Sequence, residues 1–320
     1  MNPRIVFMGT PTFAVESLKA LVEGGYNVVG VITMPDKPAG RGHKIQYSPV
    51  KEYALIQDLP LLQPERLKDE IFIEQLRTLK ADLQIVVAFR MLPEVVWNMP
   101  PLGTFNLHGS LLPQYRGAAP INWAIINGEK ETGITTFFLT HEIDTGEVID
   151  KVSIPILPSD NAGTIHDKLM TLGAQLVVKT VDAIRNNTLT SIPQSELIQD
   201  VQTLRPAPKL TKENCTIDWN KSSIDIHNFV RGLSPYPAAL TTLHTNGQPP
   251  QQVKIFETEI IEDANTHSCG SLSITSDGYL KAATATGALK VISLQLPGKK
   301  RVHSNEWLRG FRYLNDSEFK

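Results

Sequence analysis

The sequence predicts an α/β protein in two parts: a mostly parallel sheet with helices on both faces, followed by a small β-barrel domain. Three observations support this prediction. Patterns typical of buried strands and amphipathic helices alternate over the first 187 residues. The composition then becomes polar and proline-rich, and short strand patterns at roughly ten-residue spacing follow. The length of 320 residues is comfortable for two domains.

The first strand is predicted at 4–9, where RIVFMG is apolar and ends at a glycine. An amphipathic helix follows and ends at the next pair of glycines, because four apolar side chains recur at helical spacing: Val15, Leu18, Leu21 and Val22. Further patterns predict strands at 27–33, 81–89, 104–109, 133–140 and 147–156, and helices near 65–79 and over 161–185. This alternation is typical of a parallel sheet covered on both faces.

The chain changes character near residue 187. The stretches NNTLTSIPQ and LRPAPKL are polar and rich in proline, which indicates a linker. A helix pattern at 222–232 and short strand patterns with the turn signals SDG and ATG follow, and they predict a small barrel. The predicted domains are 1–187 and 207–320, joined by a linker over 188–206.

The composition excludes several classes of protein. No apolar run approaches the roughly 20 residues that span a bilayer, and the N-terminus lacks the features of a signal peptide. Cys215 and Cys269 match no metal-binding spacing, and two unpaired cysteines suit a reducing compartment. We therefore expect a cytoplasmic protein without a membrane contact.

Charge is unevenly distributed along the chain. Residues 1–200 contain 17 basic and 22 acidic side chains, whereas residues 201–320 contain 14 basic and 11 acidic ones. The basic second part is compatible with a polyanionic partner. Ordinary scatter of surface charge explains the same numbers, so composition alone leaves both interpretations open.

The segment FNLHGSLLPQYRGAAP contains the strongest site candidates. Asn106 and His108 stand two residues apart in a predicted strand, so they share one face of the sheet. Asp144, in the stretch IDTG, follows another predicted strand. Open α/β sheets bind ligands beyond the carboxyl ends of their strands. An amide and an imidazole there can stabilise a developing oxyanion, and a carboxylate can organise proton transfer. A structural polar pair and a plain Asx turn are the alternatives.

Other kinds of site lack their motifs. The stretch GTPTF after the first strand has no GxGxxG pattern, and no GxxxxGK[ST] occurs, which argues against a dinucleotide or P-loop site. A Ser-His hydrolase is disfavoured because no GxSxG is present and Ser110 precedes a loop. His141-Glu142 and His166-Asp167 resemble fragments of HExxH, but each lacks the second histidine, so no metal site is expected.

These residues resemble a known family. The combination of NxHxSLLPxxRGxxP with DTG is specific to formyltransferases that use 10-formyltetrahydrofolate. Within that group the chain is similar to the methionyl-tRNA formyltransferases over nearly its whole length. The matching stretches include IVFMGTPTFA, PDKPAGRG, SPVK, KLTKENCTIDWN and RGLSPYPAA. One departure is Arg90, in a stretch that is usually more apolar in the family.

The resemblance implies a Rossmann-like catalytic domain, a linker and an OB-like barrel. It also implies formyl transfer from 10-formyltetrahydrofolate, as cosubstrate, to the α-amino group of initiator methionyl-tRNA, by a metal-free enzyme that we expect to be a monomer. The implied catalytic residues are Asn106, His108 and Asp144. The implied folate contacts are Ser110, Leu111, Leu112 and Pro113.

The resemblance further implies that the loop over roughly 34–50 meets the tRNA acceptor end. Residues 33–51 contain four cations, Lys37, Arg41, Lys44 and Lys51, against Asp36 alone. Arg205 and Lys209 extend the predicted tRNA contacts beyond the loop. Two rivals stay open at this stage: a formyltransferase for an amino sugar nucleotide and a tRNA-binding module without activity. The roles of Arg90 and Arg116 are not assigned by the pattern.

Overall fold

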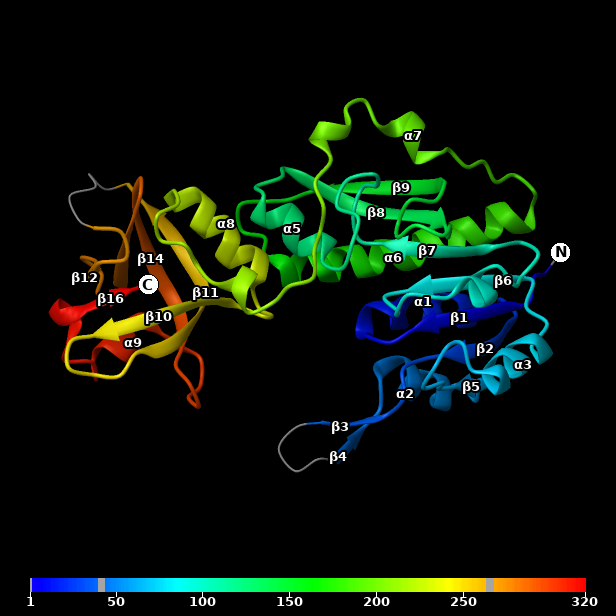
Figure 1. Cartoon of the computed structure of the whole chain (residues 1–320), viewed down its shortest axis with the longest axis horizontal. Coiled ribbons are helices and arrows are strands. Elements are labelled where there is room, and N and C mark those ends of the chain that lie inside the picture. Colours follow the sequence, from blue (N-terminus) through cyan, green and yellow to red (C-terminus); the bar gives the residue numbers. More distant parts are fainter. Residues whose placement is uncertain (1, 40–43, 263–267) are drawn as a thin grey trace. The chain divides into compact units, whose positions relative to one another are not determined.

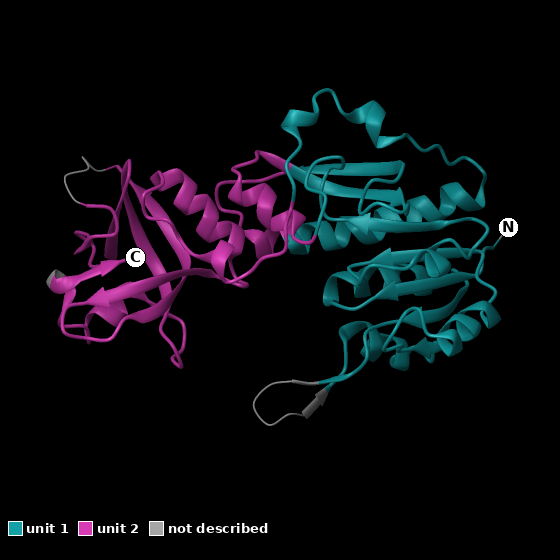
Figure 2. Ribbon diagram, viewed as in Figure 1, with its two compact units in different colours: residues 1–117, 132–154, 166–206 teal, residues 118–131, 155–165, 207–320 magenta. Residues whose placement is uncertain are grey.

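The computed structural model describes residues 2–39, 44–262 and 268–320, with the backbone alone at 38–39, 44–45 and 315. The chain forms two compact units (Figure 2). Unit 1 contains residues 1–117, 132–154 and 166–206, and unit 2 contains residues 118–131, 155–165 and 207–320. Each unit is therefore made of three separate stretches of the chain. The sequence prediction has instead one continuous range for each domain and a linker between them.

Unit 1 is built on a seven-stranded sheet with the order β5-β2-β1-β6-β7-β8-β9 (Figure 1). Adjacent strands from β5 to β7 pair in parallel, and β8 runs antiparallel to β7. The mostly parallel sheet predicted from the sequence is thus confirmed. The strands are β1 (Ile5–Gly9), β2 (Val28–Ile32), β5 (Leu61–Leu62), β6 (Leu83–Val87), β7 (Thr104–His108), β8 (Glu131–Phe138) and β9 (Val148–Pro155).

Helices cover both faces of this sheet. One face packs against α3 and α4 through a cluster that includes Met8, Val86 and Leu76. On the other face α6 approaches β7 so closely that a methyl group on Gly173 would lie 2.7 Å from a methyl of Leu107. The helices of unit 1 are α1 (Thr12–Glu23), α2 (Pro49–Ile56), α3 (Glu70–Thr78), α4 (Glu94–Trp97) and α7 (Gln194–Leu197), together with α6 (Ala162–Arg185), whose first residues belong to unit 2.

Two helices differ in detail from the sequence prediction. In α1 the buried face contains Leu18 and Leu21, as expected, but Phe13 and Ala14 replace Val15 and Val22. The reason is the close approach of Ala14 to Gly9, where an added methyl group would lie only 2.6 Å away. Helix α3 begins at residue 70 rather than near 65, because the carboxylate of Asp69 caps its first backbone N–H groups.

The strand order creates a switch point in the sheet. The chain proceeds from β1 to β2 and β5 on one side and then crosses to β6 and β7 on the other. The connections that leave the carboxyl ends of β1 and β6 therefore diverge, and a crevice forms at such a position. His108 is the last residue of β7, which lies beside β6, so this edge of the sheet positions the site described below.

Unit 2 is an antiparallel β-barrel, as predicted. Its strands follow the order β12-β13-β14-β11-β10-β16, and a bridge between Ser271 and Glu318 joins the two ends. The core includes Trp219 stacked on Phe319 at 5.3 Å between ring centroids. The strands are β10 (Ala239–Thr245), β11 (Gln251–Ile261), β12 (Leu272–Ile274), β13 (Leu280–Thr284), β14 (Gly287–Gln295), β15 (Val302–His303) and β16 (Ser317–Phe319).

The remaining elements are short or lie at the edges of the units. Unit 2 also contains the helices α5 (Pro120–Ile126), α8 (Ser223–Leu233) and α9 (Ser304–Leu308). In unit 1, β3 (Lys37–Ala39) and β4 (Lys44–Gln46) pair antiparallel within the stretch that the sequence predicts as a loop. Across the described part of the chain, no helix has the length and apolar character needed to cross a membrane.

Candidate active site

Strand β7 presents two polar side chains on one face. Phe105 and Leu107 alternate with them and are buried on the opposite face, with exposed fractions of 0% and 3%. Asn106 is half-buried and His108 is buried. The strand alternation expected from the sequence therefore holds, and it directs Asn106 and His108 to the same side of the sheet.

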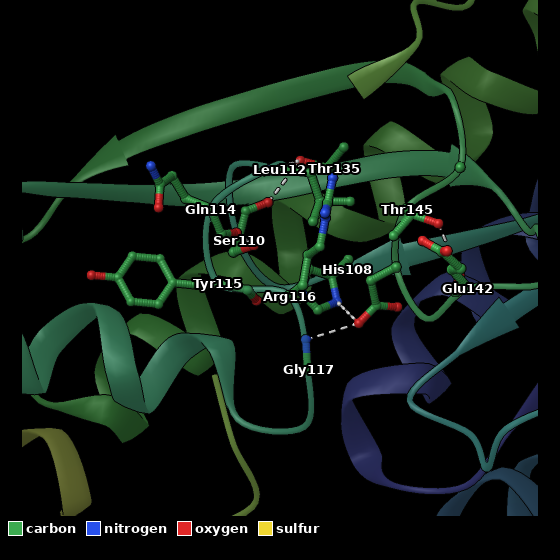
Figure 3. Close-up of polar contacts among 12 residues, drawn as sticks. His108, Ser110, Leu112, Gln114, Tyr115, Arg116, Gly117, Thr135, Glu142 and Thr145 are labelled. Atoms are coloured by element: carbon green, nitrogen blue, oxygen red, sulfur yellow. Dashed lines mark hydrogen bonds and ion pairs between the residues drawn. The ribbon is translucent and has the colours of Figure 1, made fainter. Parts of the chain in front are cut away.

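The two ring nitrogens of His108 have different environments (Figure 3). Nε2 lies 2.8 Å from the carbonyl oxygen of Tyr115, and a carbonyl can only accept a hydrogen bond. Nε2 therefore carries the hydrogen in the neutral ring. Nδ1 faces the carboxylate of Asp144 at 3.8 Å, a separation too long for a direct hydrogen bond. The carboxylate therefore acts on this side of the ring through its charge.

Asp144 is held by the loop that follows β7. Its carboxylate accepts a hydrogen bond of 2.9 Å from the backbone N–H of Gly117. Its own backbone has φ of 55°, in the left-handed region that aspartate tolerates better than most residues. The same carboxylate oxygen that faces His108 receives this hydrogen bond (Figure 3). A hydrogen bond to one oxygen of the Asp144 carboxylate thus connects the 110–117 loop to the IDTG loop.

The side chain of Asn106 makes no hydrogen bond to any residue that the structure describes. In register, Asn106 lies between Val86 on β6 and Phe137 on β8, so its amide stands over the middle of the sheet near its carboxyl edge. An amide without an internal partner, two residues from His108 on the same face, is available to a bound molecule. Its N–H₂ group can donate to an oxygen and its carbonyl can accept.

The loop after β7 is fixed mainly by its own hydrogen bonds. The hydroxyl of Ser110 donates to the carbonyl of Gln114 at 2.6 Å, and the hydroxyl of Thr135 donates to the carbonyl of Ser110 at 2.7 Å. Leu112 packs in a cluster with Phe137 and Val148. Ser110 and Leu112 are both 0% exposed. Their side chains are thus turned inward, whereas Leu111 and Pro113 are half-buried and keep exposed surface.

The structure also reveals a residue that the sequence pattern missed. Gln194 belongs to the stretch predicted as a linker, yet its side chain is only 3% exposed and reaches the IDTG loop. It also accepts two hydrogen bonds from Arg116. A glutamine in a polar, proline-rich stretch carries no local pattern that distinguishes it from a solvated residue. This explains why the sequence did not predict its position.

A cavity of about 670 Å³ opens beyond the carboxyl end of β6. It is lined by residues 65–68 and 90–95. The Arg90 guanidinium donates to the backbone carbonyls of Pro64 and of Glu65, so it joins the two lining segments. Burial lowers the pKa of Arg90. The residue that departs from the family pattern is therefore part of the cavity wall.

The basic residues predicted to contact tRNA lie in several separate places. Lys37 is exposed at the start of β3. Arg41 and the side chain of Lys44 lie outside the described part of the structure. Arg205 is exposed in unit 1, beside the 114–115 loop, and Lys209 is exposed in unit 2.

Lys51 has an internal role that the sequence did not indicate. Its ammonium group lies 2.5 Å from the carboxylate of Asp36 and 3.9 Å from the ring centroid of Tyr47. The hydrogen bond from Lys51, and then one from Gln63, lower the pKa of Asp36. This pair braces the base of the β3–β4 hairpin, so Lys51 contributes less positive charge to the outer surface than its sequence position suggests.

Comparison with protein families agrees with this geometry. A family model described as "Formyl transferase" matches residues 3–181, and one described as "Formyl transferase, C-terminal domain" matches residues 209–312. A Bacteroides thetaiotaomicron protein named methionyl-tRNA formyltransferase is 65% identical over 309 residues, which cover 97% of this chain and 96% of that protein. A Flavobacterium johnsoniae protein of the same name is 53% identical over 316 residues, which cover 98% of each chain.

Solved structures share the fold. An N-formyltransferase from Helicobacter canadensis, in complex with folinic acid and dTDP-3-aminofucose, has a TM-score of 0.66 at 21% identity and covers 90% of this chain and 98% of that one. HypX from Aquifex aeolicus, in complex with tetrahydrofolic acid, has a TM-score of 0.60 at 18% identity, covering 96% and 47% of the two chains. At these identities the likeness extends to the fold alone.

Proposed function

The chain belongs to the formyl transferase family, and from this premise we propose that it transfers a formyl group from 10-formyltetrahydrofolate to the α-amino group of initiator methionyl-tRNA. The product is formylmethionyl-tRNA for translation initiation. The observation that carries the proposal is the His108–Asp144 pair, beside the unpaired amide of Asn106, at the carboxyl edge of the sheet. The curated relatives, which match along nearly their whole length, support the choice of substrate. We propose a monomer that acts in the cytoplasm.

The reaction joins the amine nitrogen of the methionyl ester to the formyl carbon and breaks the bond from that carbon to the folate nitrogen. Negative charge develops on the formyl oxygen as the amine attacks. The amide of Asn106 has no partner in the described structure, so it can donate to this oxygen without first breaking a bond. A hydrogen-bond donor aimed at a developing oxyanion stabilises its charge strongly.

His108 is the proposed proton carrier, through Nδ1. Because Nε2 donates to the carbonyl of Tyr115, the neutral ring has its free electron pair on Nδ1, on the side of Asp144. Nδ1 can take the proton that the attacking amine loses and give it to the departing folate nitrogen. The negative charge of Asp144 stabilises the positive ring between these two transfers. The sequence predicted the pair, and the contacts of the two ring nitrogens support Nδ1 as the one that acts.

A strong base is not required for the attacking amine. A free α-amino group titrates near pH 7.7–8.0, and the electron-withdrawing ester lowers that value further. A substantial fraction of the amine is therefore neutral near pH 7. The enzyme's main task is then to hold the amine and the formyl carbon together and to manage one proton, for which Asn106, His108 and Asp144 suffice without a metal ion.

The cavity beyond β6 is the proposed site for part of the folate. Its volume of about 670 Å³ lies in the range of small-molecule sites. It opens at the same edge of the sheet as His108, because β6 and β7 are adjacent and parallel. Arg66 and Lys68 line it and are exposed, which suits the carboxylates of a folate. Arg90 braces the wall. The other proposed folate contacts are Ser110, Leu111, Leu112 and Pro113, of which Leu111 and Pro113 keep exposed side-chain surface.

For tRNA we propose contacts through the cations Lys37, Arg41, Lys44, Arg205 and Lys209. Replacing Lys209 with alanine is expected to raise KM for the tRNA and leave KM for the folate unchanged, because Lys209 is exposed in unit 2 and the proposed folate site lies in unit 1. The slope of log KM for tRNA against log salt should fall by about 0.7–0.9. An equal rise in both KM values would instead indicate a general defect of the fold.

One assay tests the proposed function against its rivals. The wild-type protein is incubated with charged initiator tRNA, with and without 10-formyltetrahydrofolate, and in parallel with an amino sugar nucleotide. We expect formylation of the tRNA that depends on the folate, and no reaction with the sugar nucleotide. Formylation of the sugar nucleotide alone would establish the first rival, and tRNA binding without turnover would establish the second.

A further inference from the structure

One buried side chain connects the two loops of the site. The amide of Gln194, at the start of α7, is 3% exposed and makes four hydrogen bonds within unit 1. Its nitrogen donates to the backbone carbonyls of Asp144 and Gly146, at 2.9 and 2.8 Å. Its oxygen accepts from Nε and Nη2 of Arg116, at 3.0 and 2.7 Å. All the hydrogen-bonding positions of the amide are therefore used.

The neighbours of Gln194 fix the direction of its amide. Carbonyls only accept hydrogen bonds and a guanidinium only donates them. In the reversed amide, the oxygen would face two carbonyls and the NH₂ group would face the guanidinium, so no hydrogen bond would form on either side. A fully satisfied polar group in a buried position holds its partners strongly, because each lost partner would leave an unpaired group without water. Gln194 therefore links the IDTG loop to Arg116 in one arrangement.

Both loops linked by Gln194 determine where the Asp144 carboxylate lies. One of the held carbonyls belongs to Asp144 itself, whose backbone is in the left-handed region and needs surrounding contacts to stay there. The other partner, Arg116, directly precedes Gly117, whose N–H donates to that carboxylate. Moving Gln194 would thus disturb the backbone and the carboxylate contact of Asp144 together.

Gln194 belongs to the segment 191–205, which we call the strap, and the contacts of this segment hold Gln194 in place. Ile192 pairs with Val148 through two backbone hydrogen bonds of 2.8 and 2.9 Å, and Leu197 packs on the cluster of Leu112 and Phe137. At the other end of the strap, the backbone N–H of Tyr115 donates to the carbonyl of Arg205 at 2.7 Å. The strap is thus tied to the 110–117 loop as well as to β9.

We propose that Gln194 is a positioning residue for formyl transfer: it holds the carboxylate of Asp144 toward Nδ1 of His108. The expected effect on the rate rests on the proposed function. The link between Gln194 and Asp144 rests on the contacts described above. It gives the segment 191–205, which composition indicates as a linker, a role in the geometry of the active site. Gln194 itself makes no hydrogen bond to His108 in the described structure.

Two variants with different charge test this role. Gln194→Met keeps the length of the side chain and removes all four hydrogen bonds. Gln194→Glu keeps the contact with Arg116 and removes the two donors to the IDTG loop. We expect both to lower kcat by about 10- to 100-fold, as a displaced catalytic group does, with each KM within about threefold of wild type. Ser195→Ala, at the exposed neighbouring position, is the matched control and should keep the wild-type rate.

A double-mutant cycle distinguishes positioning from a general structural role. If Gln194 acts through Asp144, then adding Gln194→Met to Asp144→Asn should lower kcat by less than about threefold. The same 10- to 100-fold loss in that background would overturn the inference. Wild-type kcat in a folded Gln194→Met protein would also overturn it. Should Gln194→Met lack a cooperative thermal transition, the cycle is carried out with Gln194→Glu, which keeps the Arg116 contact.

Hydrogen exchange gives a readout that does not depend on activity. Peptides that cover residues 141–147 should exchange faster in Gln194→Met than in wild type, while peptides from the barrel strands stay unchanged. Unchanged exchange at 141–147 would contradict the inference even if formylation is confirmed. Faster exchange in a protein that does not formylate methionyl-tRNA would support the structural link and reject the proposed function, so the two failures can be told apart.

Discussion

Replacing His108 with alanine is expected to lower kcat for formyl transfer by about two to four orders of magnitude, the usual range for a positioned acid–base group. The loss should appear in kcat, because the proposed role of His108 is proton transfer. The described contacts of its ring are to groups of the protein: the carbonyl of Tyr115, the ring of Phe137 and the carboxylate of Asp144. Steady-state kinetics with charged initiator tRNA measure this. KM for the folate should stay within about threefold of wild type.

The role of His108 can be separated from its packing. Alanine leaves the Tyr115 carbonyl without its donor, so His108→Gln, whose amide can donate to this carbonyl, is the matched variant. If the proton transfer through Nδ1 is the essential feature, both variants lose activity to a similar extent. Combining His108→Ala with Asp144→Asn should add little, because residues that act as a unit are not additive. A glutamine variant with near wild-type kcat would disprove the proton-transfer role.

Replacing Asn106 with alanine is expected to lower kcat by about two to three orders of magnitude, which corresponds to roughly 2.7–4 kcal/mol for one lost oxyanion donor. The free energy of unfolding should change by less than about 0.5 kcal/mol, because the Asn106 side chain has no hydrogen-bond partner in the described structure. A large loss of activity at constant stability is a specific expectation for a group whose partner is the substrate. Kinetics and thermal melting on the same preparation measure both.

Two variants control the Asn106 result. Asn98→Ala removes an exposed asparagine amide after α4 and should leave kcat and stability unchanged. Asn106→Asp keeps the shape of the side chain but places a negative charge toward the developing oxyanion, so it should be at least as inactive as the alanine variant. A fall in kcat of less than threefold for Asn106→Ala would remove Asn106 from the mechanism.

Much of the fold could be predicted because its patterns are local. Apolar runs of strand length predicted each long strand of the sheet to within a few residues, and the alternation with helices predicted the parallel pairing of β1, β2, β6 and β7. Which side chains of a helix face the core was harder to predict. In α1 the sequence offers two adjacent apolar stripes, and only the fit of Ala14 against Gly9 selects between them. Short elements such as β3 and β4 carry too few residues for a periodic pattern.

The site was predictable where the strand geometry alone places a side chain. Asn106 and His108 share a face because every strand alternates. Asp144 is a different case, because β8 runs antiparallel to β7 and ends opposite Phe105, so the loop after β8 has to bring Asp144 back to His108. The sequence did not indicate that the side chains of Ser110 and Leu112 are buried. A sequence motif gives the order of residues along a loop, but hydrogen bonds to Gln114 and Thr135 decide which side chains turn inward.

By itself the sequence determined that this protein has a mostly parallel α/β unit and a barrel, and that an amide and an imidazole share one face of a strand near its carboxyl end. These follow from periodicity and chain order, which are properties of neighbouring residues. Only the tertiary structure decided that Nε2 of His108 is held by Tyr115, that Nδ1 faces Asp144, and that Gln194 holds Asp144 in place. Gln194 lies 50 positions from Asp144 in the chain. Contacts at such separations depend on how the whole unit packs, and no local pattern encodes them.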